Sequence, residues 1–371
     1  MAQVLRVGVI GCGGIAQMMH LPFLAERPDR FEIAALSDVR GEVLEAVARR
    51  YGVARRYLDY RELLRDAAVD AVLILSGDSH RQPVIDAARA GKPIFVEKPL
   101  AESRGDLDAI AGALAESRVP LLVGYHKRYD PAYLAARERV AGMADLRFVQ
   151  VTVLHPVDAD YRQHHRIEPP GSPEELAAAH DEARDGLHAL VTSEAVASRI
   201  RPVVGDRASA GQMLATFMLF NSLIHDVNAV RGVLGEPERV VHAQHWHGGR
   251  AIHAVLAFGR DVRCALSWIY LPGLMHYREE LLFAGPSSRV VLTFPSPYLR
   301  HAPTSLLVEE TGAQGLVQSR ITPSYEEAFR AELHHFYQVV TAGERPLTDL
   351  ADARGDTLVL EQMARACVET K

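Results

Sequence analysis

Short hydrophobic runs alternate with helical patterns along the first third of the chain. Runs of this kind predict strands, and they occupy residues 4–10, 31–38, 69–75, 93–97 and 119–125. The stretches between them, such as 41–51 and 81–90, are typical of helices, and Gly91 follows the second where a C-terminal cap is expected. Strands that are hydrophobic on both faces and alternate with helices indicate a parallel sheet covered on both sides. The pattern therefore predicts a doubly wound α/β domain.

The pattern changes after about residue 133. A strand is expected at 146–155, followed by a polar stretch of helical pattern that extends to about residue 211. A hydrophobic helix follows at about 214–234. Several strands joined by short turns then run between residues 239 and 310, which predicts a mainly antiparallel sheet.

The end of the chain is helical, at residues 325–342 and 349–368. With the sheet before it, this favours a second domain of the α+β class. We therefore expect a nucleotide-binding type of domain over residues 1–125 and an α+β domain over 126–371. The polar stretch reads as a helical insertion into the second domain, around residues 160–211.

Composition and charge narrow the class of protein. The 371 residues are 48% hydrophobic and 24% charged, and the net charge is -6. The chain therefore lacks the excess of basic residues that would indicate binding to nucleic acid or to an acidic membrane surface. Cys12, Cys264 and Cys367 are few and far apart, which favours a reducing compartment without structural disulfides. The first strand leaves no room for a cleavable leader, and no hydrophobic run reaches the length of about 18 residues typical of a membrane span. We expect a cytoplasmic protein.

A glycine-rich turn follows the first predicted strand. Gly11, Gly13 and Ala16 have the spacing G-x-G-x-x-[GA], which permits a tight turn, a close approach of backbone to a pyrophosphate and close packing of the next helix. The N–H groups at the start of that helix attract phosphate. Gly14 and Ile15 belong to the same turn. Its position between a strand and a helix predicts dinucleotide binding, and the alternative is a glycine turn without a cofactor.

Asp38 stands at the end of the second predicted strand. A carboxylate there accepts hydrogen bonds from the adenosine ribose and repels a 2′-phosphate, which favours NAD over NADP. Arg40 lies two residues further on, where a guanidinium softens that repulsion. NAD is therefore the expected cofactor, with NADP possible.

Lys98 ends the fourth predicted strand in the stretch PIFVEKPL, with Glu97 before it and Pro99 after it. Ligands bind beyond the carboxyl ends of the strands in an open parallel sheet. Pro99 keeps Lys98 out of helical geometry and fixes its direction. Desolvation beside a cationic nicotinamide would lower the pKa of Lys98 and suit it to proton transfer. The alternative is a surface lysine that follows an edge strand.

Four motifs together resemble a known family of oxidoreductases. GVIGCGGIA, DAVLIL with His80 after it, AGKPIFVEKPLA and GYHKRYDPAY are similar to the glucose–fructose oxidoreductase / inositol dehydrogenase (Gfo/Idh/MocA) family. The resemblance covers residues 4–155 and resumes at 221–237. It implies a Rossmann domain followed by a large open antiparallel sheet that serves substrate binding and subunit contact. It also implies that Lys98 is catalytic near the nicotinamide and that the following proline is often cis.

The family usually carries a second cluster, D-x-x-x-H-x-x-D, on a helix of the C-terminal domain. The matching positions are Asn221, His225 and Asn228, which share one face of an α-helix by spacing. His225 is then expected to take or return the hydroxyl proton, and the alternative is a histidine satisfied in the core. Asn221 replaces the usual acid, and an amide orients an imidazole without stabilising its charge. Asp226 lies about 100° around the helix and is a poor substitute.

The remaining expected contacts lie in loops at the ligand edge of the first domain and in the insertion. The substrate is expected to meet Tyr125, Lys127 and Arg128, for which packing at the domain linker is the alternative. His165 lies in an Arg- and His-rich stretch of the insertion, which either overhangs the cleft or serves dimerisation. The expected cofactor contacts are Gly11, Gly13, Gly14, Ile15, Ala16, Asp38, Arg40, Ser76, His80, Glu97 and Lys98. No cysteine or acid stands at ligand spacing from the strand histidines, so no metal is expected.

These patterns favour an NAD(P)-dependent oxidoreductase that acts on a sugar, a cyclitol or a sugar derivative, with Lys98, His225 and Asn221 as its catalytic residues. A homodimer or homotetramer formed through the C-terminal sheet is the expected assembly. Two alternatives stay open: a non-catalytic NAD-bound sensor or regulatory subunit, and a hydrolase or lyase that uses the hydride only transiently. Fold alone does not decide among them.

Overall fold

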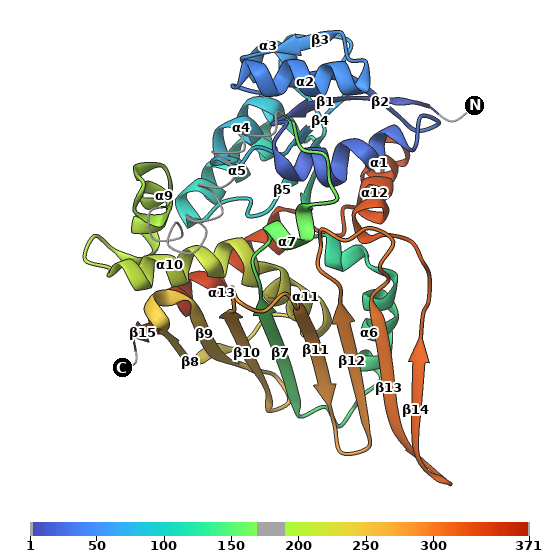
Figure 1. Cartoon of the computed structure of the whole chain (residues 1–371), viewed down its shortest axis with the longest axis vertical. Helices are drawn as coiled ribbons and strands as arrows, with labels where there is room; N and C mark the ends of the chain where they lie inside the picture. The colour runs from blue at the N-terminus through green and yellow to red at the C-terminus, as the bar shows by residue number, and fades with distance from the viewer. Residues whose placement is uncertain (1–2, 169–189, 370–371) are drawn as a thin grey trace. The chain divides into compact units, whose positions relative to one another are not determined.

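The computed structural model describes residues 3–168 and 190–369, which divide into two compact units (Figure 1). The first unit holds residues up to His126, a short segment that begins at His164, and Phe329–Arg354. The second unit holds Lys127–Gln163, most of the chain up to Ala328, and the C-terminal residues. The first break falls beside the expected boundary at residue 125, but the first unit also recruits two later segments.

A six-stranded sheet forms the centre of the first unit, in the order β3-β2-β1-β4-β5-β6 with every pair parallel. The predicted Rossmann type of sheet is thereby confirmed. β3 was not predicted, because its residues Arg55–Tyr57 are polar and at most half-buried and so carry no hydrophobic run. The strands are β1 (Leu5–Ile10), β2 (Phe31–Ser37), β3 (Arg55–Tyr57), β4 (Ala71–Ile74), β5 (Ile94–Glu97) and β6 (Leu121–Gly124).

Helices alternate with these strands along the chain. Their ends follow local signals: Gly52 and Gly91 take positive φ angles of 69° after two of the helices, and Ser103 accepts a hydrogen bond from the Asp106 N–H at the start of another. The first helix contains a π-helical turn at Ala16–His20. The helices are α1 (Leu21–Ala25), α2 (Gly41–Tyr51), α3 (Tyr60–Arg65), α4 (Arg81–Arg89) and α5 (Arg104–Ser117).

Helix α12 (Ala328–Ala342) belongs to the first unit, whereas the sequence pattern assigned it to the second domain. Its hydrophobic side packs on the first unit, where the ring of Phe336 lies 5.8 Å from that of Phe95 and the ring of Phe329 lies 5.6 Å from His20. Burial of these aromatic rings holds the helix in place. Periodicity shows that a helix has a hydrophobic face but not which sheet receives it.

A nine-stranded sheet forms the second unit, in the order β14-β13-β12-β11-β7-β10-β9-β8-β15. Most neighbours are antiparallel, as predicted, but β7 pairs with β10, and β15 with β8, in parallel. The edge strand β14 was not predicted, because nearly all of its residues are exposed. The strands are β7 (Phe148–His155), β8 (Arg239–Trp246), β9 (Ala251–Phe258), β10 (Val262–Tyr270), β11 (Arg278–Ala284), β12 (Ser288–Phe294), β13 (Ser305–Gly312), β14 (Gly315–Ile321) and β15 (Cys367–Glu369).

The hydrophobic helix expected at 214–234 is longer than predicted and is not regular. It runs over Ala210–Leu234, and a π-helical turn at Leu219–Leu223 separates α10 (Ala210–Met218) from α11 (Ile224–Leu234). By length and composition this helix would suit a membrane, but 78% of its most hydrophobic window is buried inside the protein, as in a core helix. The other helices are α6 (Pro131–Ala141), α7 (Ala159–Arg162), α9 (Glu194–Val204) and α13 (Leu350–Ala366).

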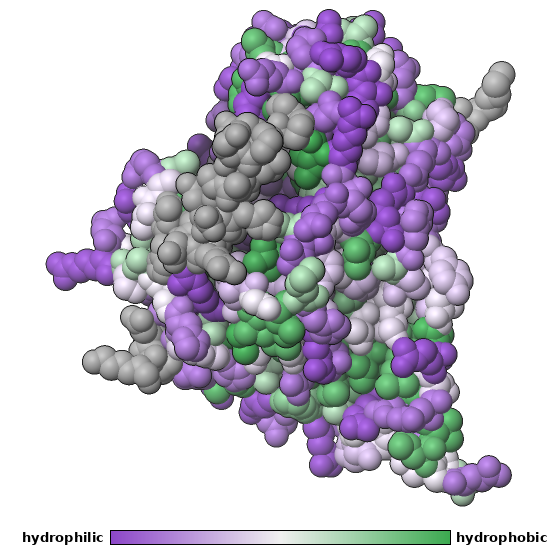
Figure 2. All heavy atoms as spheres, in the orientation of Figure 1, coloured by the Kyte–Doolittle hydropathy of each residue, from purple (hydrophilic) through white to green (hydrophobic). Residues whose placement is uncertain are grey.

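The two faces of the nine-stranded sheet differ. α6 packs on β12 and β13, and the indole of Trp268 in β10 donates a hydrogen bond to Ser222 Oγ, 3.0 Å away on the long helix. In Figure 1 the strands lie in front of α6 and α11, and within the described residues no helix crosses the lower part of the face toward the viewer. Figure 2 shows hydrophobic residues interspersed with polar ones over that face.

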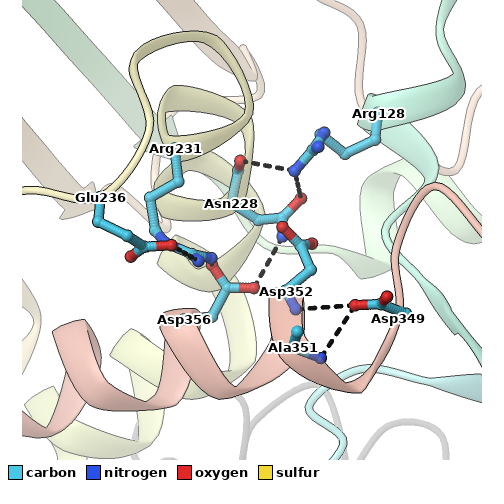
Figure 3. Close-up of polar contacts among 8 residues, drawn as sticks. All are labelled: Arg128, Asn228, Arg231, Glu236, Asp349, Ala351, Asp352 and Asp356. Carbon is cyan, nitrogen blue, oxygen red and sulfur yellow. Dashed lines mark hydrogen bonds and ion pairs between the residues drawn. The ribbon is translucent and has the colours of Figure 1, made fainter.

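A buried arginine ties α11 to α13 in the second unit (Figure 3). The guanidinium of Arg231 lies 2.5 Å from Asp356 and also pairs with Glu236. Gly355 lies directly against this guanidinium, because an added Cβ would stand 2.5 Å from Arg231 Cζ and closer still to Nη2. A glycine is therefore needed here for space.

Gly355→Ala is expected to lower the free energy of unfolding by about 3 kcal/mol, since the methyl group must displace a buried, paired guanidinium. Gly112→Ala is the matched control: it lies in α5 with nothing within 4 Å of an added Cβ, and it should stabilise by about 0.5–1 kcal/mol. Thermal and denaturant midpoints measure both changes. A wild-type midpoint for Gly355→Ala would contradict the steric argument.

Candidate active site

The backbone turns tightly at the glycine loop after β1 and passes close to the neighbouring strand's end. Gly11 has a φ of +93°, and a Cβ there would stand 2.6 Å from the backbone nitrogen of Ser76, so only glycine fits. At Gly13 an added Cβ would meet no atom within 4 Å, which leaves the backbone open to a ligand. The helix begins at Gly14, and Ala16 is fully buried beneath it. The loop therefore has the form that a pyrophosphate requires.

Asp38 links this loop to the end of β2. Its carboxylate accepts hydrogen bonds from the Cys12 N–H at 2.8 Å and the Arg40 N–H at 2.9 Å, and the Arg40 guanidinium lies 3.5 Å away. Carboxylate oxygens accept more than one hydrogen bond each, so capacity for ribose hydroxyls remains. Burial raises the pKa of Cys12 to about 12, so the thiol stays protonated and Cys12 is a loop residue. These residues fit an adenosine dinucleotide.

The loops after β4 and β5 are braced by His80. Its Nδ1 lies 2.7 Å from the carbonyl oxygen of Pro99, and its Nε2 lies 2.9 Å from that of Ser76. Both polar atoms of the ring are thus used inside the protein, and the side chain is buried. His80 holds the two loops together, and any cofactor contact from it is confined to carbon atoms of the ring.

Lys98 follows β5 and is half-buried. The Lys98–Pro99 peptide bond is cis, as the family resemblance implied. Glu97, expected to contact the cofactor, is instead turned into the interior, where His20 Nε2 lies 2.7 Å from Oε1 and the Lys98 N–H donates to Oε2 at 3.2 Å. Burial acts to raise the pKa of Glu97, but the hydrogen bond and charge of His20 outweigh it and hold the pKa below its usual value.

The segment that begins at His164 lies on the first unit beside the glycine loop. The Gln17 side chain donates to the carbonyl oxygens of Cys12 at 2.8 Å and Glu168 at 2.7 Å, and it accepts the Glu168 N–H at 2.7 Å. Arg50 in α2 pairs with the Glu168 carboxylate at 2.8 Å. The segment carries His165, half-buried beside the His164 ring. The rest of the expected insertion, residues 169–189, lies outside the described residues.

The three matched positions on the hydrophobic helix do not share one environment. Asn221 is exposed on the π-helical turn, His225 is half-buried at the start of α11, and Asn228 is buried. Asn228 donates to Asp356 at 2.7 Å and accepts from Arg128 at 3.3 Å (Figure 3). Asn228 therefore belongs to a buried polar network, whereas Asn221 and His225 are at least partly exposed.

Two residues expected to bind substrate are instead paired inside the second unit. Lys127 is 4% exposed and its ammonium lies 2.9 Å from Glu279, while Arg128 is 6% exposed and reaches Asn228. The structure thus favours the alternative reading of these two residues, packing at the linker, because the 3-10 turn His126–Tyr129 directs them inward. Tyr125 is also buried.

Asp226, next to His225 in sequence, is buried with Glu279. Burial and then the charge of Glu279 raise the pKa of Asp226 well above its usual value, so it is a neutral acid hydrogen-bonded to Glu279. Burial acts to raise the pKa of Glu279, but the charge of Lys127 and hydrogen bonds from its neighbours outweigh it and lower the pKa. Asp226 therefore carries no charge that replaces the acid missing at Asn221.

Sequence reasoning missed Gln17 and His20. Gln17 and His20 follow the glycine loop in the stretch QMMHLPFL, where two polar residues interrupt a hydrophobic run. Such interruptions signal buried polar groups that need partners. Their partners, Glu168 and Glu97, are too distant in sequence for pattern alone to reveal.

Comparison with known proteins finds that the first unit is similar to a family of oxidoreductases. Residues 5–125 match the Gfo/Idh/MocA family model, described as an oxidoreductase family with an NAD-binding Rossmann fold. The inositol 2-dehydrogenase of Paracoccus denitrificans is 39% identical over 140 residues, which are 37% of this chain and 41% of that protein. The myo-inositol 2-dehydrogenase of Thermotoga maritima is 36% identical over 37% of this chain and 40% of that protein. The matched stretch thus spans about two fifths of these relatives.

Other matches extend over nearly the whole chain. Inositol 2-dehydrogenase 1 of Saccharopolyspora erythraea is 27% identical over 97% of this chain and 93% of its own length. Among solved structures, a 3-ketoreductase from Actinomadura kijaniata in complex with NADP and TDP-benzene has a TM-score of 0.71 at 19% identity and covers 99% of each chain. An aldose-aldose oxidoreductase from Caulobacter crescentus has a TM-score of 0.72 at 20% identity, covering 98% of this chain and 97% of its own.

Structural matches at this level of identity establish the fold of both units, and the sequence match to the family model covers the first. The glycine loop, Asp38 and the cis proline after Lys98 all lie within that match. Over residues 5–125 the chain is similar to the Gfo/Idh/MocA oxidoreductase family with its NAD-binding Rossmann fold.

Proposed function

We propose that the protein transfers a hydride between NAD(P) and a carbinol or ketone carbon of a sugar, a cyclitol or a sugar derivative. The observation that carries the proposal is the pairing, in one sheet, of an open glycine loop at β1 with a half-buried lysine at the end of β5. Relatives named inositol 2-dehydrogenases, and structural neighbours named a 3-ketoreductase and an aldose-aldose oxidoreductase, support the substrate class.

Protein side chains would manage the proton, while bound NAD(P) supplies the hydride acceptor or donor. Lys98 would hold the reacting oxygen and exchange its proton. His225 would act as the second acid or base, with Asn221 orienting it or the substrate. His165 stays a candidate substrate contact. Lys127 and Arg128 are left out of the proposal because Glu279 and Asn228 hold them.

A panel of inositols, aldoses and nucleotide sugars, with the corresponding ketones for the reverse direction, tests the function. The protein is incubated with NAD and, separately, with NADP, and the absorbance of the reduced nicotinamide is followed. Substrate-dependent change with at least one sugar or cyclitol is expected. Product formed without net change in the nicotinamide would indicate transient oxidation instead, and binding without any turnover would indicate a sensor.

The cofactor preference is expected to depend on Asp38. We expect the wild-type protein to bind NAD more tightly than NADP, because the carboxylate accepts ribose hydroxyls and repels a 2′-phosphate. Asp38→Asn should shift the ratio of the two dissociation constants toward NADP by about tenfold, close to 1.4 kcal/mol. Titration calorimetry with both dinucleotides measures it, and Arg40→Ala, which removes only the guanidinium, should shift the ratio toward NAD. Tighter binding of NADP by the wild-type protein would contradict this role of Asp38.

The assembly proposed is a homodimer or homotetramer formed through the nine-stranded sheet. The face of that sheet toward the viewer bears hydrophobic residues among polar ones (Figure 2), and no helix crosses its lower part within the described residues, which supports a contact with another copy there. Sedimentation velocity of the purified protein determines the number of copies.

A further inference from the structure

The interior of the first unit holds two carboxyl groups and a histidine close to Lys98. Glu97 is 7% exposed and Glu332 in α12 is fully buried, as is His20. His20 Nε2 lies 2.7 Å from Glu97, and the other Glu97 oxygen accepts the backbone N–H of Lys98. Burial of a charged group costs free energy unless the group is paired. We therefore asked what the buried Glu97 and His20 contribute beside Lys98.

His20 is fixed in orientation by two aromatic rings. It ends the π-helical turn that follows the glycine loop, and its ring meets Phe95 edge-on at 5.2 Å and Phe329 at 5.6 Å. These contacts direct Nε2 at Glu97. The pair therefore joins the helix of the cofactor loop to the residue immediately before Lys98.

Glu332 differs from Glu97 in having no such partner. Among the described residues, neither of its carboxyl oxygens has a hydrogen-bond partner. Burial, and then the charge of Glu97, raises the pKa of Glu332 well above its usual value, so Glu332 is a neutral acid. Of the two carboxyl groups, Glu97 alone carries a charge.

We propose that His20 and Glu97 are a positioning pair for Lys98, in which His20 keeps Glu97 ionised and Glu97 both fixes the Lys98 backbone and favours the protonated ammonium. The charged and titratable groups that act on Glu97 are His20 from the first helix, Lys98, His80 from the loop after β4, and Glu332 from α12. This inference rests on the proposed role of Lys98 in proton transfer.

The consequence is a shift in the pH dependence of turnover. A carboxylate near an ammonium favours its protonated form, so removal of that charge lets the lysine lose its proton at lower pH. Glu97→Gln removes the charge directly. His20→Leu removes the donor, so that buried Glu97 becomes protonated and neutral. Both variants should therefore move the Lys98-dependent limb of the kcat profile in the same direction.

The experiment measures kcat against pH for the best substrate of the panel, with cofactor affinity by calorimetry. Glu97→Gln and His20→Leu are expected to shift the Lys98 limb to lower pH by about one unit, with NAD(P) affinity within about threefold of wild type. His20→Gln keeps a donor toward Glu97 and should restore most of the wild-type profile. Glu332→Gln replaces a neutral acid with a neutral amide and should leave the limb in place.

Two results would overturn the proposal. One is an unmoved limb in folded Glu97→Gln and His20→Leu proteins, which would make the pair purely structural. The other is a shift in Glu332→Gln as large as that in Glu97→Gln, which would mean that Glu332 is charged. Failure of the proposed function looks different, because no sugar or cyclitol of the panel would then be turned over by the wild-type protein. A wild-type rate in Lys98→Met would instead remove the role of Lys98 on which this inference rests. If His20→Leu does not fold, the test compares Glu97→Gln with Glu97→Asp. Glu97→Asp retains the negative charge and should keep the wild-type pH profile.

Discussion

Lys98→Met should lower kcat by about 10³-fold while NAD(P) affinity stays within about threefold of wild type. General acid–base catalysis by one side chain contributes about 10²–10⁴-fold, and methionine keeps the hydrophobic stem while it removes the ammonium. Glu97, held by His20, stays beside the altered position and keeps the loop in place. Steady-state kinetics on the best substrate, with calorimetry for the cofactor, measures the two quantities separately.

Lys92→Met is the matched control, because Lys92 lies just before the same strand at its opposite end. Its ammonium donates to the carbonyl oxygens of Val69 at 2.5 Å and Asp66 at 3.3 Å. Loss of these contacts should lower stability without changing kcat. A wild-type rate in Lys98→Met, or equal losses of kcat in both variants, would remove Lys98 from the chemistry.

His225→Asn should lower kcat by about 10²-fold and remove one ionisation from the pH profile. Asn221→Asp should keep activity and move the His225 limb to higher pH, since a nearby carboxylate favours the imidazolium. Asp226 does not already supply this charge, because it is buried as a neutral acid against Glu279. The profiles of kcat against pH for the two variants measure both effects.

His253→Asn serves as the control for a histidine outside the proposed site. His253 lies on β9 with its Nδ1 3.0 Å from Ser267 Oγ, and its replacement should leave the profile unchanged. If His225→Asn and Asn221→Asp change only the thermal midpoint, His225 is a core residue, and Lys98 must carry the proton with another group.

The features that sequence predicted well are those that local spacing determines. The glycine loop lies between a strand and a helix within a few residues, so Gly11 and Asp38 are recognisable from their neighbours alone. Hydrophobic runs locate β1, β4, β5 and β6, because strands buried on both faces carry few polar residues. β3 and β14 were not predicted, because edge strands that are mostly exposed show no such hydrophobic run.

The direction of individual side chains could not be predicted, because it depends on partners far away in the chain. Glu97 turns inward to His20, and Lys127 turns inward to Glu279, although both stand at an edge where ligands bind. Asn228 joins a buried network with Arg128 and Asp356 (Figure 3). The π-turn at Leu219–Leu223, on which Asn221 lies, was not predicted either, because periodicity assumes regular turns.

The return of α12 to the first unit bears on the order in which the protein is made. Phe95 and His20 emerge early from the ribosome, whereas Phe329 and Phe336, which cover them, follow about 230 or more residues after Phe95, or roughly 10–50 s later. During that interval the hydrophobic surface around β5 lacks its native cover. The growing chain therefore exposes the residues beside Lys98 to chaperones for longer than a contiguous Rossmann domain would, and completion of the cofactor unit becomes a late event in biosynthesis.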